Sequence, residues 1–406
     1  MGFKKWFISF ALQGASISLF NIVISLYVVL ALHGNVQNAS IAVALFSFGN
    51  LLGSISASIV LDRVKRVSIL IYTSFFVASF IMVLMVFVKS IYIYYLLSVL
   101  LGNVISFTGP AMTLHLSKIE DEGFVRRQIN NLNLFNSIGS TLGMLFGSFI
   151  LTLIKNLNDI FKLKMIFFIS SILLLTSSVL TIERGTLKVS VSPHLRATKI
   201  LFLKVVNFAN EFFKVVDIRN LPKNMRLITA SVFMAFFGAN LVFSVFTVFL
   251  KEAFRVSSQF IFLLYSANSF AGNIAFFLTG RLLMTKYDRL FIRVVLFLRG
   301  ILFILIGVFV VFKLDFMRAF IYASFVFFGF TWPFFYIPLT LEITNLAPHK
   351  ERGKALGIFN MSINFAVILA SFVAGFIALH LGYFATFIIG GTLLILGERL
   401  FTKTFS

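Results

Sequence analysis

Long apolar runs separated by short polar segments make up almost the whole chain. A helix needs about 20 mainly apolar residues to cross roughly 30 Å of hydrocarbon, because each unpaired backbone polar group is costly in lipid. The pattern predicts twelve such helices, and therefore an all-α polytopic membrane protein. The predicted helices cover residues 7–32, 39–61, 67–88, 91–116, 128–154, 165–182, 227–250, 258–280, 294–312, 319–341, 355–379 and 383–398.

One long polar interruption divides the chain into six predicted helices on each side. We expect an N-terminal six-helix bundle over 1–182, a cytoplasmic linker over 183–226 and a C-terminal six-helix bundle over 227–406. Within the linker, a helix over 196–219 would place its polar residues opposite an apolar face, with a net charge of +3. We favour an amphipathic helix lying on the anionic cytoplasmic leaflet, with packing against the bundle ends as the alternative.

The two halves of the chain repeat each other. Residues 124–147 parallel residues 352–375 at an offset of about 228, so that Asn136 falls on Asn364 and Gly147 on Gly375. Both segments lie at the same place in their half, with the same side facing the cytoplasm. The sequence therefore predicts two six-helix pseudo-repeats, an arrangement typical of transporters.

Composition excludes a soluble protein. The chain is 59% hydrophobic and 12% charged, against about 25% charged residues in soluble domains. Its net charge of +21 does not indicate nucleic-acid binding, because the basic residues lie between apolar runs. Of the 35 Lys and Arg residues, 26 fall on the side that carries both termini and 8 on the other. Short loops rich in Lys and Arg stay in the cytoplasm, so we expect a protein of the cytoplasmic membrane with both termini cytoplasmic.

Residue types and motifs that the sequence lacks exclude several kinds of chemistry. The chain has no Cys, which excludes disulfides, a thiolate metal site and a cysteine nucleophile. It has no G-x-x-x-x-G-K-[ST] motif, which argues against ATP-driven transport by this chain. The five His residues form no pair at ligand spacing, so we expect no metal and no cofactor.

The join between the second and third predicted helices carries a recognisable motif. It contains Ser58, Asp62, Arg63, Val64, Lys65, Arg66 and Val67. This segment resembles the marker loop G-x-x-x-D-R-x-G-R-R of the major facilitator superfamily, with the Asp-Arg pair and one later Arg matching and Ser, Lys and Val departing. Together with the topology and the sequence ERGKALG before the eleventh helix, the chain is similar to this superfamily over essentially its full length. The resemblance implies a substrate site at the membrane midplane between two halves that rock about it.

Charged residues at the cytoplasmic ends are candidates for a gate. Asp62 is a lone carboxylate beside Arg63 and Arg66, near the expected N-terminus of the eleventh helix, where the helix dipole favours an anion. The resemblance implies that breaking such contacts biases opening toward the cytoplasm; the alternative is an exposed charge that merely sets topology. Further pairs of this kind are Glu120 with Arg126 or Arg127, and Glu342 or Glu351 with Arg352.

The resemblance also implies that the first, fourth, seventh and tenth helices line the path. Polar side chains within hydrocarbon must face partners or water, so the polar arcs of these helices are expected to point inward. For each Asn, an interhelical hydrogen bond without a substrate role is an equal alternative. Pro333 and Pro338 should kink or locally unwind the tenth helix. The candidate substrate-binding residues are Gln13, Asn21, Asn103, Ser106, Asn240, Ser244, Trp332 and Tyr336.

Arg299 is the one ionisable residue deep within a predicted helix. A buried Arg is costly and should have a partner or face water. It lies on the ninth helix, which the resemblance makes an outer helix, so we favour a structural role over anion binding. Proton coupling, facilitated diffusion and movement of an anionic solute remain open.

The sequence thus predicts a secondary active or facilitative transporter, not an enzyme, that moves a small solute by alternating access as a functional monomer in the lipid bilayer. Aromatic, amide and hydroxyl side chains without a deep carboxylate favour efflux of amphipathic, drug-like compounds. Uptake of a sugar or an organic anion is the alternative. A polytopic membrane enzyme and a non-transporting membrane sensor are rival classes, and substrate-dependent flux would separate them from a permease.

Overall fold

The computed structural model describes residues 2–61, 67–117, 122–154, 156–182, 223–282, 288–312, 316–346 and 352–405. Twelve helices in this part are long and apolar enough to cross a membrane, which confirms the predicted all-α fold. The first half contains α1 (Gly2–Leu30), α2 (Val36–Leu61), α3 (Val67–Phe87), α4 (Ile91–Ile105), α5 (Thr108–Ser117), α6 (Glu122–Leu153) and α7 (Asp159–Leu180). The second half contains α9 (Lys223–Phe254), α10 (Ser258–Leu282), α11 (Asp288–Phe312), α12 (Met317–Leu346), α13 (Arg352–His380) and α14 (Gly382–Thr404).

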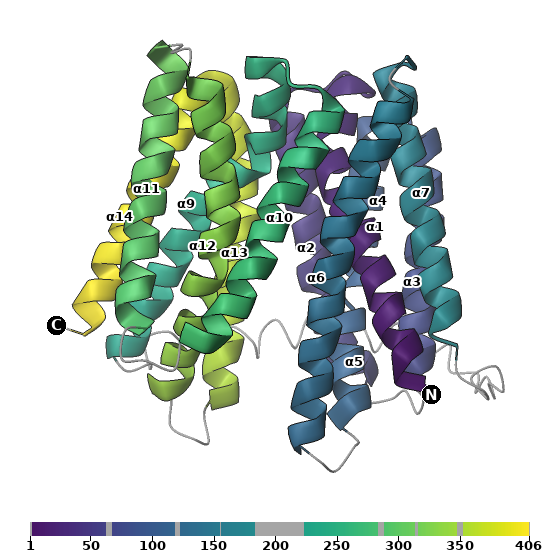
Figure 1. Cartoon of the computed structure of the whole chain (residues 1–406), viewed down its shortest axis with the longest axis horizontal. Coiled ribbons are helices and arrows are strands. Elements are labelled where there is room, and N and C mark those ends of the chain that lie inside the picture. Colours follow the sequence, from purple (N-terminus) through teal and green to yellow (C-terminus); the bar gives the residue numbers. More distant parts are fainter. Residues whose placement is uncertain are drawn as a thin grey trace.

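The helices form two bundles that stand side by side (Figure 1). Helices α1 to α7 pack with one another, and helices α9 to α14 do the same. Both termini lie toward the lower end in Figure 1, which we call the terminal end; the opposite end is the far end. The bundles meet mainly where α2 packs on α13 and α6 packs on α10.

The fourth predicted helix, expected to be regular over 91–116, is divided into α4 and α5. Pro110 has no backbone N–H, so it cannot donate to the carbonyl of Ser106 one turn earlier. Two hydroxyl groups serve carbonyls beside the break: Ser106 donates to the Asn103 carbonyl at 2.9 Å and Thr108 to the Ile105 carbonyl at 2.8 Å. The polar face predicted for a straight helix is therefore not continuous.

Two other predictions can be compared with the structure. Helix α12 remains helical through Pro333 and Pro338, so the tenth span is not locally unwound there; the other alternative, a kink, stays a prediction. The sixth span begins at Asp159, earlier than the predicted 165, because Asn158 accepts a hydrogen bond from the Ile160 N–H and caps the helix. The amphipathic helix predicted over 196–219 lies outside the described residues.

Two glycines at equivalent positions of the repeat face the opposite bundle. A Cβ on Gly375 of α13 would lie 2.5 Å from the Cα of Gln37 on α2. A Cβ on Gly147 of α6 would lie 2.5 Å from the Leu19 side chain of α1 in its own bundle and 2.9 Å from the Phe262 ring of α10 in the other. Beside Gly147, the Ser148 hydroxyl donates to the Gln259 carbonyl of α10 at 2.9 Å. The repeat read from the sequence therefore corresponds to two matching sites where the bundles approach closely.

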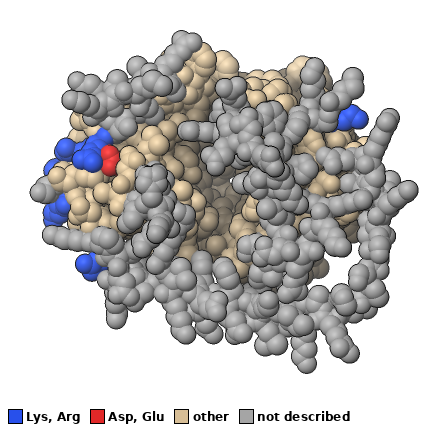
Figure 2. All heavy atoms as spheres, turned by 90° about the horizontal axis from the view of Figure 1, so that it is seen from below, with Lys and Arg blue, Asp and Glu red and all other residues tan. Residues whose placement is uncertain are grey.

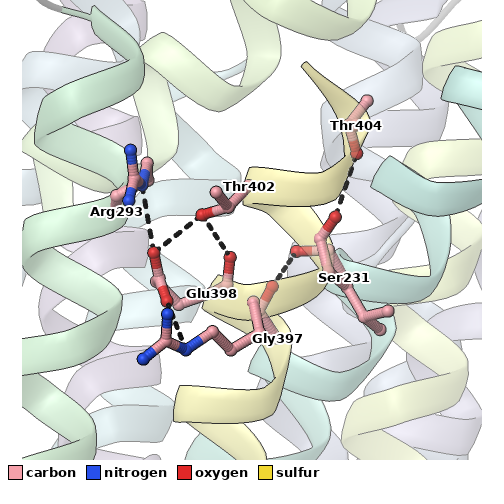
Figure 3. Close-up of polar contacts among 8 residues, drawn as sticks. Ser231, Arg293, Gly397, Glu398, Thr402 and Thr404 are labelled. Carbon is pink, nitrogen blue, oxygen red and sulfur yellow. Dashed lines mark hydrogen bonds and ion pairs between the residues drawn. The ribbon is translucent and has the colours of Figure 1, made fainter. Parts of the chain in front are cut away.

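A buried acid and the carbonyl beside it join three helices of the second bundle (Figure 3). Glu398 of α14 is 5% exposed and accepts a hydrogen bond from the Arg293 Nε of α11 at 3.0 Å. It also accepts from the Thr402 hydroxyl at 2.8 Å. One residue earlier, the Gly397 carbonyl accepts from the Ser231 hydroxyl of α9 at 2.6 Å. These bonds fix α9, α11 and α14 to one another without using the interface between the bundles.

Candidate substrate site

A central cavity of about 390 Å³ lies between the two bundles. Helices α1 and α2 form one wall, and helices α9 to α12 form the other. Its size is in the range of cavities that hold small organic molecules. The lining residues are Asn21, Ile24, Ser25, Val43, Phe46, Asn240, Phe243, Ser244, Thr247, Tyr265, Asn268, Arg299, Phe325, Phe328 and Trp332.

Several of the candidate substrate-binding residues meet at this cavity. Asn21, Asn240, Ser244 and Trp332 line it. Tyr336 stacks on Trp332 with ring centroids 5.3 Å apart, one helical turn toward the terminal end. The seventh and tenth spans thus present the faces that the sequence predicted, because polar and aromatic side chains gather on one side of each helix.

A second, smaller cavity adjoins the first. It measures about 270 Å³ and shares Asn21 with the central cavity. Gln13 lines it and donates from Nε2 to the Thr108 hydroxyl at 3.1 Å. The other amide atom of Gln13, the oxygen Oε1, is buried and has no hydrogen-bond partner among the described residues. Gln13 therefore lines this side cavity with an amide that is anchored on α5 through Thr108.

Asn103 and Ser106 are not brought to either cavity. A Cβ on Gly53 of α2 would collide with the Asn103 carbonyl oxygen, so α2 and α4 are in close contact there. The Ser106 hydroxyl is engaged with the Asn103 carbonyl at the helix break. Both residues therefore lie where α4 ends against α2.

Some residues that line the central cavity were not predicted from the sequence. Tyr265 and Asn268 come from α10, a helix that the resemblance did not assign to the path. Tyr265 is held by the Thr247 hydroxyl of α9 at 2.8 Å. Their polarity within an apolar run was a visible signal, but nothing in the sequence distinguishes a cavity wall from an interhelical hydrogen bond.

Arg299 also lines the cavity, although its helix was expected to lie outside. The residue is 4% exposed, and its Nε donates to the Thr331 hydroxyl of α12 at 2.9 Å. Its Nη2 donates to the Phe328 carbonyl. The guanidinium carbon lies 5.7 Å from the centroid of the Trp332 ring. The long side chain thus extends from α11 along α12 to the cavity wall, which the position of the helix alone did not reveal.

The structure describes the side chains of only some of the predicted gating residues. Asp62, Arg63, Arg66 and Glu120 lie outside the described residues, as do the side chains of Arg127 and Arg352. Glu342 is buried near the end of α12 and accepts from the Arg289 Nε of α11 at 2.8 Å. In the described part, this carboxylate is therefore paired within its own bundle.

At the far end, an ion pair joins the bundles. The Lys251 Nζ of α9 lies 3.1 Å from one carboxylate oxygen of Asp159 on α7, whose other oxygen lies 3.2 Å from the Lys162 Nζ. Nearer the middle, Ser137 and Asn273 share a hydrogen bond, and the hydroxyls of Thr141 and Ser269 lie 2.7 Å apart. The described hydrogen bonds between the bundles thus run from the middle of the helices to the far end.

At the terminal end, the described surface is hollowed between the two bundles. Seen from below, the described atoms recede into a hollow between the two bundles (Figure 2). Among the described residues, the bonds between the bundles thus lie from the middle to the far end, and the hollow lies at the terminal end.

A match to known families decides what kind of protein this is. The model of the Major Facilitator Superfamily matches residues 6–349 and, in a second match, residues 228–402. The chain belongs to the major facilitator superfamily. It is a multi-pass membrane protein and a secondary transporter of a small solute, not an enzyme.

Solved transporters share the fold at low sequence identity. The nucleoside transporter NupG is 17% identical, with a TM-score of 0.73 and full coverage of both chains. A POT family transporter in complex with 5-aminolevulinic acid is 13% identical, with a TM-score of 0.75 over 100% of this chain and 97% of that one. A D-xylose-proton symporter is 14% identical, with a TM-score of 0.70 over 99% and 98%. No curated protein matches the sequence.

Proposed function

We propose that this superfamily member exports a small amphipathic solute across the cytoplasmic membrane by alternating access, with both termini in the cytoplasm. The central cavity between the bundles is the observation that carries the proposal. Its wall combines amide and hydroxyl groups with the rings of Phe46, Phe243, Phe325, Phe328 and Trp332, which suits a solute with both polar and apolar parts.

The cycle follows from the contacts between the bundles. A solute enters the cavity from the terminal end and contacts Asn21, Asn240, Ser244 and Trp332. Rocking of the bundles then breaks the ion pair between Asp159 and Lys251 and opens the far end. In this proposal the charges at the terminal end, Asp62, Arg63, Arg66, Glu120, Arg127, Glu342 and Arg352, hold that end shut.

Uptake of a sugar or an organic anion is the second candidate. The position of Arg299 on the cavity wall favours an anion over a sugar. Flux measured in both directions, with and without an imposed pH gradient, distinguishes export from uptake and shows whether protons are coupled.

The test measures solute flux in proteoliposomes, with and without a reversible disulfide cross-link between the two bundles. A Cβ on Gly375 would lie 3.0 Å from the Ser40 Cβ, less than the spacing of about 3.5–4.5 Å in disulfides, and 2.5 Å from the Gln37 Cα, so α2 and α13 must shift apart slightly to hold a bond. We expect the double variant Ser40→Cys with Gly375→Cys to form this disulfide under oxidant, in a chain that has no native Cys. We expect solute flux that oxidation abolishes and a reductant restores.

The single variants Ser40→Cys and Gly375→Cys are the matched controls, and their flux should not respond to oxidant. If no solute in the panel shows saturable flux in the unmodified protein, the transport proposal fails. If the cross-linked protein transports at the full rate, alternating access through this interface is wrong.

A further inference from the structure

The charge of Arg299 has no counter-charge among the residues whose side chains the structure describes. It lies near the middle of the span Arg289–Phe312 and is 4% exposed. No described carboxylate forms an ion pair with it; the described pairs involve other Lys and Arg residues. A buried charge without a partner is strongly unfavourable, so this position needs a physical explanation.

The described carboxylates have other partners. Asp159 binds Lys162 and Lys251, and Glu342 binds Arg289. Glu398 binds Arg293, and Glu252 accepts a hydrogen bond from the Tyr383 hydroxyl at 2.7 Å. These acids lie toward the ends of their helices, whereas Arg299 lies midway along α11. None is therefore available to neutralise the guanidinium.

The hydrogen bonds of Arg299 hold it in place without using all its donors. A guanidinium has five N–H groups in a planar fork. Nε is taken by the Thr331 hydroxyl and Nη2 contacts the Phe328 carbonyl, and the described residues supply no further acceptor. The remaining N–H groups belong to a side chain that lines the central cavity. Two anchored nitrogens and free donors at a cavity wall are the arrangement of a preorganised anion site.

The rest of the cavity wall suggests the nature of the anion. Among the described residues that line it, Arg299 is the one charged side chain, so the wall compensates a single negative charge. Asn21, Asn240 and Asn268 add neutral donors and acceptors, and the ring of Trp332 offers a stacking surface beside the guanidinium. A neutral sugar would leave the charge unmatched, and a dianion would leave one negative charge unmatched in a desolvated site.

We propose that the central cavity binds a small organic monoanion, whose carboxylate is recognised by Arg299 and whose apolar part lies against the aromatic wall. This inference rests on the proposed transport function and names its substrate class. Arg299 is then a specificity-determining residue, and its charge is neutralised when the solute is bound.

The test compares carboxylates with their neutral amides on the purified full-length protein. The probes are benzoate, phenylacetate and indole-3-acetate, each paired with its primary amide, in thermal-shift titrations and in proteoliposome counterflow. We expect at least one carboxylate to bind more tightly than its amide. Arg299→Gln should weaken binding of that carboxylate about 10- to 100-fold, the range of a charge-assisted hydrogen bond, and leave the amide unchanged.

Two further variants separate recognition from a structural role. Arg299→Lys keeps the charge but not the fork, so it should retain the preference for the carboxylate at reduced affinity. Arg289→Gln removes an Arg of the same helix that lies outside the cavity, and its preference should equal that of the unmodified protein. Without ligand, Arg299→Gln should melt at the same or a higher temperature, because an uncompensated buried charge is removed.

Equal binding of carboxylates and amides by the unmodified protein would overturn the inference. So would an unchanged carboxylate preference in Arg299→Gln, or a large loss of its ligand-free stability. Failure of the transport proposal is a different result: carboxylates would bind with the expected selectivity, yet no solute of any charge would show counterflow.

Discussion

At the residue scale, the protein contains buried charges of two kinds. Glu398 is enclosed by Arg293 and Thr402, so its charge is neutralised and its oxygens accept hydrogen bonds. Arg299 has hydrogen bonds to neutral groups alone among the described residues. The first arrangement stabilises a bundle, whereas the second is ready to receive a ligand.

The role of the Glu398 pair can be tested by removing its partner. Arg293→Gln leaves a buried carboxylate without its counter-charge and should lower the free energy of unfolding by about 1–3 kcal/mol. Arg399→Gln is the control, because the Arg399 Nε lies 3.7 Å from Glu398 and its side chain is 68% exposed. We expect about 0–1 kcal/mol there. Thermal melts of the detergent-solubilised variants check both values, and equal effects would contradict the assignment.

The sequence identified part of the site for a clear physical reason. Asn21, Asn240 and Ser244 interrupt long apolar runs, and polar groups in hydrocarbon must face partners or water. Asn103 and Ser106 share that property but lie beside a helix break that Pro110 imposes, where the Asn103 carbonyl and the Ser106 hydroxyl lie against Gly53 of α2. Glu398 was missed as a buried residue because the predicted helix ended there, whereas α14 continues to Thr404 and buries Phe401.

At the element scale, α2 and α13 approach closely because a glycine replaces a side chain at their contact. The sequence repeat predicted that Gly147 and Gly375 are equivalent. It could not predict that each faces the other bundle, since nothing local distinguishes packing within a bundle from packing between bundles. Small residues are required wherever two helix backbones come together in a membrane.

A side chain at this contact should open it. Gly375→Val places a Cβ 2.5 Å from the Gln37 Cα, which is backbone and cannot rotate away. We expect the far end to separate more often, measured as faster labelling of a single Cys introduced at Ser25 by a membrane-impermeant thiol reagent from the far side. Gly357→Ala on the same helix is the control, because a Cβ there meets nothing within 4 Å. Identical labelling of both variants would exclude this contact as a closure point.

At the scale of the whole molecule, twelve spans and their grouping were predictable, because hydrocarbon thickness sets helix length and a repeat sets the arrangement. The conformational state was not. It depends on a few contacts between distant segments, such as Asp159 with Lys251, whose sequence separation gives no hint of proximity.

The two partners of Asp159 offer a comparison within one site. Lys251→Gln removes a bond between the bundles and should shift the population a few-fold toward opening at the far end, since partly exposed pairs contribute about 0–1 kcal/mol. Lys162→Gln removes a bond within α7 and should leave the population unchanged. The same Ser25→Cys labelling measures both, and exchanging the charges at 159 and 251 should restore the original rate. A larger effect of Lys162→Gln would contradict the role of the Asp159–Lys251 pair in closing the far end.

Arg299, a cation near the middle of its span and without a counter-charge among the described residues, should make transport sensitive to voltage. Loaded with a monoanion, the central site is neutral and crosses the electric field without moving charge, whereas the empty site returns as a cation. Moving one elementary charge through 100 mV corresponds to about 2.3 kcal/mol. The rate of solute-for-solute exchange should therefore not depend on an imposed potassium diffusion potential, whereas the net flux should change with it. In Arg299→Gln, the return of the empty carrier should no longer depend on voltage.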